Sequence, residues 1–146
     1  MTETEKMAVL SALNKRSAGT LMDLLGIEFI DVGDDFLTVK MTITPQTHQP
    51  AGIMHGGVSV VLGETAGSCL SNLLLGEGQH AVGCDITAHH LRPVRAGTVY
   101  CTARLRRKGR TMHYSEMEVS DEQGRLVCAM SMSNMVVAAK NQAGNV

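Results

Sequence analysis

One long stretch of helical periodicity, residues 55–75, constrains the fold of this chain more than any other feature. Its residues recur at the i, i+3, i+4, i+7 spacing of a single helical face. They are Val58, Val61, Leu62, Thr65, Ala66, Cys69, Leu70, Leu73 and Leu74. At 1.5 Å per residue the helix would be roughly 30 Å long, enough to cross a small domain. We therefore expect it to be the central element.

Extended segments stand on both sides of this helix. Residues 27–30 and 36–44 form a predicted hairpin before it, and residues 80–90, 98–108, 111–120 and 125–137 are predicted strands after it. The short connections between them imply antiparallel hairpins. The predicted fold class is therefore α+β, with an antiparallel sheet of five to six strands and one long central helix.

The two ends of the chain are predicted to be less regular. Thr2-x-x-Glu5 and Thr20-x-x-Asp23 have the form of capping boxes, which predicts two short helices within a lead-in of residues 1–25. The second should stop at Gly26, a residue suited to a left-handed cap. The tail, residues 138–146, shows no pattern and is predicted to fray.

Composition narrows the class of protein. A chain of 146 residues that is 44% hydrophobic and 18% charged predicts one domain over residues 1–146. The net charge of −1 gives no field that would attract nucleic acid or an anionic membrane. Without a signal-like start or an apolar run of membrane length, we expect a cytoplasmic protein. Four separated cysteines with no Cys-x-x-Cys pair predict buried, reduced thiols: Cys69, Cys84, Cys101 and Cys128.

The face of the helix opposite the apolar stripe is unusual. It carries small residues and a single acid where a solvated face usually carries several charges. Its members are Gly57, Val60, Glu64, Ser68 and Ser71, with Gly63 and Gly67 nearby. We interpret it as a subunit interface that another backbone can approach closely. The alternative is a tolerant exposed surface.

His55-Gly56-Gly57 at the predicted start of the helix suggests chemistry. A polar ring beside unpaired amides and the positive end of the helix dipole suits a developing oxyanion. The alternative is that the glycines only make a tight loop and that His55 caps the helix. Glu64 lies roughly 13 Å along the axis, too far to serve the same reacting atom. Two antiparallel helices across a two-fold axis would bring Glu64 of one chain to His55 of another.

Basic residues gather in the second half of the chain: Arg92, Arg95, Arg104, Arg106, Arg107, Lys108 and Arg110. Guanidinium groups bind phosphates through paired charge-assisted bonds, so we predict a local phosphate-binding patch. The alternative is a set of charges that guard exposed strands against edge pairing. No metal site is indicated, because His89 and His90 would point to opposite faces of a strand.

The segment Gln49-Pro-Ala-Gly-Ile-Met-His55-Gly56-Gly57, followed by Glu64 and Ser68, resembles a known family. It is similar to the hotdog-fold acyl-CoA thioesterases of the phenylacetate-type group, especially the 1,4-dihydroxy-2-naphthoyl-CoA and enterobactin proofreading thioesterases. The resemblance runs from about residue 21 to 137. It implies a sheet wrapped around the long helix, a homodimer with active sites at its interface, and pairing of dimers into a homotetramer. It also implies hydrolysis of an aryl or hydroxyaryl acyl-CoA. Medium-chain acyl-CoA and acyl carrier protein thioesters remain alternatives, because Ala51 stands where those relatives carry an aromatic residue.

The resemblance also implies residue roles. The Gly56 N–H would polarise the thioester carbonyl, with Gln49 and His55 positioning it, while Glu64 of the other chain acts as nucleophile or general base and Ser68 places the water or carboxylate. Pantetheine and the coenzyme A phosphates would be held by Gly83, His90, Leu91, Arg92, Pro93, Lys108, Gly109 and Arg110. No metal or prosthetic group is required, since the coenzyme A thioester is the substrate. The rival functions are a non-catalytic acyl-CoA-binding module and a hotdog hydratase or dehydratase.

Overall fold

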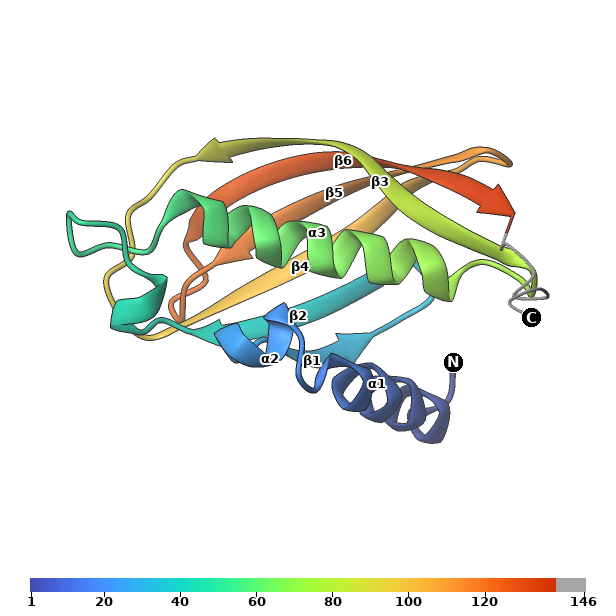
Figure 1. The fold of residues 1–146 in the computed structure, drawn as a ribbon, viewed down its shortest axis with the longest axis horizontal. Coiled ribbons are helices and arrows are strands. Elements are labelled where there is room, and N and C mark those ends of the chain that lie inside the picture. The colour runs from blue at the N-terminus through green and yellow to red at the C-terminus, as the bar shows by residue number, and fades with distance from the viewer. Residues whose placement is uncertain (139–146) are drawn as a thin grey trace, which may run out of the picture.

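The computed structural model describes residues 1–138 and contains one antiparallel sheet wrapped around a long helix (Figure 1). The elements in chain order are α1 (Glu3–Ser17), α2 (Leu21–Leu25), β1 (Glu28–Val32), β2 (Phe36–Thr42), a 3-10 turn (Pro45–Thr47), α3 (Gly56–Leu73), β3 (Gln79–His90), β4 (Thr98–Lys108), β5 (Met112–Ser120) and β6 (Leu126–Ala138). The predicted α+β architecture with a central helix is confirmed. Most of the predicted tail lies outside the described residues, and Ala138 ends β6.

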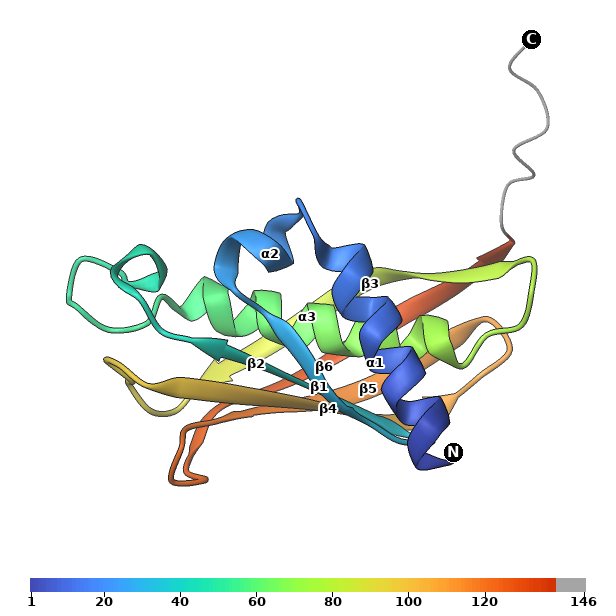
Figure 2. The same ribbon diagram turned by 90° about the horizontal axis from the view of Figure 1, so that it is seen from below.

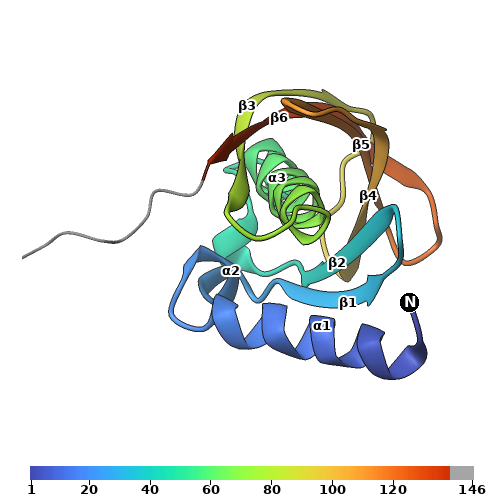
Figure 3. The same ribbon diagram turned by 90° about the vertical axis from the view of Figure 1, so that its right-hand side faces the viewer.

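The sheet has six strands in the order β1-β2-β4-β5-β6-β3, so β1 and β3 are its edges. Viewed along α3, the strands curve around the helix and leave one side of it without strand cover (Figure 3). The chain passes through α3 between β2 and β3, which carries it from one edge region of the sheet to the other. The β3 edge therefore borders the uncovered side of the helix.

The core lies between α3 and the concave face of the sheet. Leu62, Ala66 and Leu70 are completely buried along one line of the helix. Inward-facing residues of the strands meet them in alternation, as the burial pattern of β5 shows most regularly. Full burial of each such leucine contributes roughly 1.5–3 kcal/mol, so this seam holds the helix against the sheet.

The small residues of α3 do not all lie where the sequence predicted. Gly63, Gly67 and Ser71 are buried against the chain's own sheet, so their assignment to a subunit interface is wrong. The reason is the size of the facing side chains: a Cβ on Gly63 would lie 2.6 Å from the methyl carbon of Met130. Large methionines on β6 fill the space that small helix residues leave. Glu64, by contrast, is exposed as the interface prediction requires.

The two N-terminal helices frame the β1 side of the molecule (Figure 2). Thr2 and Glu5 form the predicted capping box of α1. The Asn14 side chain donates to the Phe29 carbonyl at 2.9 Å and accepts from the Phe29 N–H at 2.8 Å, which fixes α1 against β1.

The second predicted helix is present, and Gly26 ends it in the left-handed conformation with φ 67°. The predicted capping role of Thr20 is wrong. Its hydroxyl donates to the Ser17 carbonyl at 2.5 Å, whereas the Gly19 N–H donates to the Asp23 carboxylate.

Among residues 1–138, no helix is long and apolar enough to cross a membrane.

Candidate active site

The N-terminus of α3 is built by its cap, His55. The Gly57 N–H donates to Nδ1 of His55 at 2.8 Å. A ring nitrogen accepts only when it carries no proton, so the proton of the neutral ring is on Nε2. His55 therefore caps the helix, as the simpler interpretation held, and also offers an N–H donor beside the helix terminus. A Cβ on Gly57 would lie 2.9 Å from Nδ1, which explains the glycine there.

The loop before α3 is held by backbone bonds on both sides. The His55 N–H donates to the Thr47 carbonyl at 2.8 Å, and the Met54 N–H donates to the Val94 carbonyl at 2.7 Å. Gly52 adopts φ 71°, a conformation that favours glycine. The loop is thus tied to the connection between β3 and β4, which places residues from both segments around the helix terminus.

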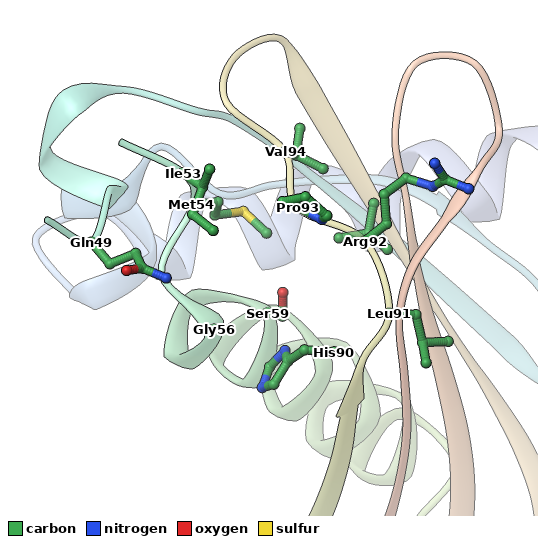
Figure 4. Close-up of a pocket in the computed structure, with 11 residues that line it drawn as sticks. Gln49, Ile53, Met54, Gly56, Ser59, His90, Leu91, Arg92, Pro93 and Val94 are labelled. Carbon is green, nitrogen blue, oxygen red and sulfur yellow. The ribbon is translucent and has the colours of Figure 1, made fainter. Parts of the chain in front are cut away.

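A cavity of about 350 Å³ opens at this helix terminus (Figure 4). It is lined by Gln49, Ile53, Met54, Gly56, Ser59, His90, Leu91, Arg92, Pro93, Val94 and Val127. The His90 ring lies against the helix, since a Cβ on Gly56 would be 3.0 Å from its Cε1 and Nε2. A side chain at position 56 would therefore push the His90 ring slightly away from the helix. The cavity combines an apolar wall with imidazole, amide and guanidinium groups.

The first amide of the helix is available to a ligand. Within residues 1–138 the Gly56 N–H has no hydrogen-bond acceptor, whereas its neighbours at 55 and 57 are both satisfied. An unpaired amide at a helix N-terminus, where the dipole is positive, attracts a negatively charged oxygen. The geometry thus offers one backbone donor for an oxyanion.

Glu64 lies on the side of α3 that borders β3. A Cβ on Gly83 would be only 2.7 Å from Oε1 of Glu64, so the carboxylate occupies the space that a side chain at position 83 would need. Asn72, two turns further along, donates to the Ala81 carbonyl at 3.1 Å and accepts from the Ala81 N–H at 2.9 Å. These bonds hold the β3 edge beside the helix. Within the described chain, Glu64 forms no salt bridge.

A second cavity, of about 320 Å³, lies between α3 and the N-terminal helices. It is lined by Leu13, Arg16, Ser17, Met22, Phe29, Ser68, Cys69, Asn72 and Leu73. Most of these side chains are apolar, and Arg16 adds a cation that makes no salt bridge within residues 1–138. Ser68 belongs both to this cavity and to the helix face that carries Glu64. The cavity is therefore adjacent to the candidate carboxylate.

The structure brings together only part of the predicted site. Gln49, Gly56 and residues 90–93 share the first cavity, but Gly83 lies beside Glu64 instead. Lys108 ends β4, and Gly109 and Arg110 lie in the turn to β5, at the opposite end of the molecule from the start of α3 (Figure 1). One chain alone does not assemble all the predicted residues.

Several residues of the predicted basic patch make contacts within the chain. Arg95 donates to the Gly52 carbonyl at 3.3 Å, and Arg106 binds Glu116 at 2.6 Å. The Arg104 guanidinium lies 5.4 Å from the centroid of the Phe36 ring. Arg92 lines the first cavity, where its side chain extends away from Gln49 (Figure 4). The basic residues thus serve several sites and do not form a single patch.

Three of the four cysteines are poor candidates for a nucleophile because of their burial. Cys101 and Cys128 are buried, and burial raises the pKa of both thiols. Burial also raises the pKa of Cys69, an effect that the charge of Arg16 opposes. Cys84 is exposed on β3, so the prediction of four buried thiols is wrong at this position. No group of metal ligands occurs within the described residues.

The sequence interpretation missed two residues near the candidate site. Arg16 lies on a lead-in helix whose sequence shows no functional pattern. Asn134 donates to the Ser68 hydroxyl at 3.1 Å from β6. A signal for Asn134 was present, because it stands in the inward phase of a strand that otherwise places Met130 and Met132 in the core.

Comparison with known proteins identifies the family. The model of the thioesterase superfamily matches residues 51–128, which is more than half of the chain and includes the start of α3, Glu64 and the lining of the first cavity except Gln49. The chain belongs to the thioesterase superfamily. Its fold is the hotdog fold, and the predicted membership of this family is confirmed.

Relatives support this assignment over nearly the whole chain. The proofreading thioesterase EntH of Cronobacter turicensis is 42% identical over 128 residues, covering 88% of this chain and 93% of EntH. The crystal structure of thioesterase HI1161 from Haemophilus influenzae superposes with a TM-score of 0.88 at 36% identity, covering 92% and 94% of the two chains. The crystal structure of a mutant of thioesterase PA1618 from Pseudomonas aeruginosa superposes with a TM-score of 0.86 at 37% identity, covering 89% of this chain and 94% of that chain. This chain is a thioester hydrolase by family.

Proposed function

We propose that this thioesterase hydrolyses an aryl or hydroxyaryl acyl-CoA in active sites shared between two copies of the chain. One observation carries the proposal: the free Gly56 N–H and the exposed Glu64 carboxylate lie on the same helix but roughly 12 Å apart along its axis. Within residues 1–138 the Gly56 N–H has no hydrogen-bond acceptor and Glu64 has no salt-bridge partner. Antiparallel packing of two copies of α3 would place the amide of one copy opposite the carboxylate of the other.

In this arrangement the thioester carbonyl oxygen binds at the helix N-terminus. The Gly56 N–H donates to the oxygen as negative charge develops, and one such donor typically contributes about 10² to 10³ in rate. We assign the orientation of the thioester to the Nε2–H of His55 and the amide of Gln49, which the cap of α3 and the lining of the first cavity support. Gln49 lines the first cavity, and His55 caps α3 at the end of the same loop.

Glu64 of the second copy activates the attack on the carbonyl carbon. As a general base, it takes a proton from water while the water oxygen bonds to carbon; the C–S bond then breaks and the thiolate receives the proton. As a nucleophile, its carboxylate bonds to the carbonyl carbon and displaces the thiolate, and water then hydrolyses the mixed anhydride. We assign to Ser68, one turn along the same face, the holding of the water or the carboxylate.

The second cavity is suited to the acyl group. Its volume of about 320 Å³ and its wall of Phe29, Met22 and Leu13 fit an aromatic ring, and Arg16 offers a polar contact to a ring hydroxyl. Arg16→Met should therefore lower kcat/KM more for a hydroxybenzoyl-CoA than for benzoyl-CoA. An equal loss with both substrates would exclude this role of Arg16. Preference for a medium-chain acyl-CoA would identify the alternative acyl group.

Coenzyme A is proposed to bind along the first cavity, from the start of α3 toward the protein surface. His90, Leu91 and Pro93 would contact pantetheine and Arg92 a phosphate. Lys108, Gly109 and Arg110, at the far end of each chain, would reach the phosphates only from a second copy. Gly83 is better placed to accommodate Glu64 than to bind coenzyme A directly. A dimer of dimers would bring further copies of the turn near the site.

Thiol release from a panel of aryl and aliphatic acyl-CoAs and acyl carrier protein thioesters tests the activity. Glu64→Ala should abolish release, whereas Glu118→Ala, on the outward face of β5, should leave it unchanged. Full activity in Glu64→Ala would exclude the proposed mechanism.

Mixed dimers test the sharing of sites. Glu64→Ala and Gln49→Ala chains, each impaired alone, are co-expressed in equal amounts. Random pairing makes half of the dimers mixed, each with one intact site, so about a quarter of the parental activity should return. No recovery would show that both residues act within one chain.

A further inference from the structure

A group of polar side chains is buried beneath α3, within an otherwise apolar core. Ser71, His113, Ser115 and Asn134 are completely buried. The last three stand on the inward face of β5 and β6, and His113 pairs directly with Asn134 across these strands. Methionines surround them at neighbouring inward positions. We call these four residues the buried polar cluster.

The contacts of this cluster are incomplete. Ser71 Oγ lies 2.6 Å from Nδ1 of His113, and Asn134 donates through Nδ2 to Ser68 Oγ at 3.1 Å. Three of its buried atoms have no hydrogen-bond partner within the described residues: His113 Nε2, Ser115 Oγ and Asn134 Oδ1. Buried polar groups without partners destabilise a fold, so their presence in this core calls for an explanation other than stability.

The bond from Asn134 determines what Ser68 can do. An amide NH₂ only donates, so the Ser68 oxygen is the acceptor in this contact and its own O–H is left to donate elsewhere. Among residues 1–138 the O–H of Ser68 has no hydrogen-bond acceptor. Ser68 follows Glu64 by four residues and so shares its face of α3. The free O–H is therefore available to the carboxylate, or to a water or carbonyl beside it.

We propose that Asn134 is a positioning residue for thioester hydrolysis, acting through Ser68. Its amide fixes the Ser68 side chain and makes the serine hydroxyl a donor on the Glu64 side of the helix. The inference rests on the proposed function, because it assigns Asn134 to the same site. It explains why the core keeps a polar residue whose amide oxygen is unpaired.

The test compares Asn134→Ala with a matched control, Ser115→Ala. Both remove a polar group from the buried cluster, but only Asn134 contacts Ser68. Loss of one orienting hydrogen bond should lower kcat by about tenfold in Asn134→Ala, with KM changed less than about twofold. Ser115→Ala should keep the parental kcat. Thermal unfolding and gel filtration establish that each variant is folded and has the parental assembly.

A double-mutant cycle with Ser68→Ala shows the route of the effect. If Asn134 acts through Ser68, the double variant should lose no more kcat than Ser68→Ala alone. Independent, multiplying losses would overturn the proposal, as would parental kcat in Asn134→Ala or an equal loss in Ser115→Ala.

The parent and Glu64→Ala are assayed alongside these variants. No thiol release by the parent, or undiminished release by Glu64→Ala, overturns the proposed function and the role of Asn134 with it. Normal behaviour of both, with no effect of Asn134→Ala, overturns only the role of Asn134.

Discussion

Gly83→Ala should impair catalysis without harming the fold. The added Cβ would lie 2.7 Å from Oε1 of Glu64, about 0.7 Å short of the 3.4 Å at which ordinary van der Waals contact begins. The carboxylate is the free end of a flexible side chain, so it moves more readily than the β3 backbone. A single methyl group thus displaces the proposed catalytic oxygen by a fraction of an ångström or forces another rotamer.

The magnitude follows from the sensitivity of catalysis to geometry. A misplacement of about 1 Å can cost about 10²-fold in rate, so we expect kcat to fall by about 10- to 100-fold. Gly83 does not have a positive φ, and alanine is accommodated there without backbone strain. Replacing glycine with alanine at such a position stabilises a protein by about 0.4–1 kcal/mol, so the free energy of unfolding should not decrease.

The assay is thiol release, measured as kcat and KM separately, with urea unfolding in parallel. Gly76→Ala is the matched control, because a Cβ at position 76 would meet no atom within 4 Å and Gly76 also lacks a positive φ. Parental kcat in a folded Gly83→Ala enzyme would refute the placement of Glu64 against Gly83. A loss of kcat that only follows a loss of stability would refute the argument from carboxylate displacement.

Three further predictions concern the core and the β3 edge. Gly63→Ala should lower the free energy of unfolding by about 1 kcal/mol, because overlap with Met130 outweighs the gain in helix propensity; stabilisation in urea would contradict this packing. Two copies that pair through their β3 edges, about the middle of Gln79–His90, would bring their Cys84 side chains close together. Mild oxidation should then link two chains in the parent but not in Cys84→Ser. Burial, with Lys108 nearby, lowers the pKa of His113, so the unfolded chain takes up a proton before the folded chain does and stability should fall as the pH drops below about 6.5. The slope of the unfolding free energy against pH should be smaller in His113→Gln than in the parent. Equal slopes would show that His113 is not the source of this pH dependence.

The sequence predicted the helix ends and strands closely because these depend on neighbours within a few residues. The Thr2 capping box, the left-handed Gly26 and the alternation in β5 are all local patterns, and the structure reproduces them. The failure at Thr20 is also local. The Thr20 hydroxyl donates to the Ser17 carbonyl, and the Thr20-x-x-Asp23 spacing gives no sign of this acceptor.

The prediction of helix faces failed for a different reason. The sheet covers α3 from several directions, so a residue can be buried without belonging to the apolar stripe (Figure 3). Gly63 and Gly67 appear open to a partner when the helix is considered alone. Their small size instead matches Met130 and Met132, which approach from a strand more than 60 residues later. This complementarity depends on how a helix and a strand pack together. The hydrophobic periodicity of either element alone does not reveal it.

The sequence by itself determined which residues this protein offers for chemistry: a histidine-capped helix start with two glycines, and one acid on the same helix. Only the tertiary structure decided how they are surrounded. It placed Glu64 against Gly83, opened separate cavities beside Gly56 and Ser68, and brought Asn134 to Ser68 across 66 positions. The physical reason is that caps and periods arise from bonds within one or two turns. Cavities and buried polar contacts arise from the packing of side chains that are distant in the chain.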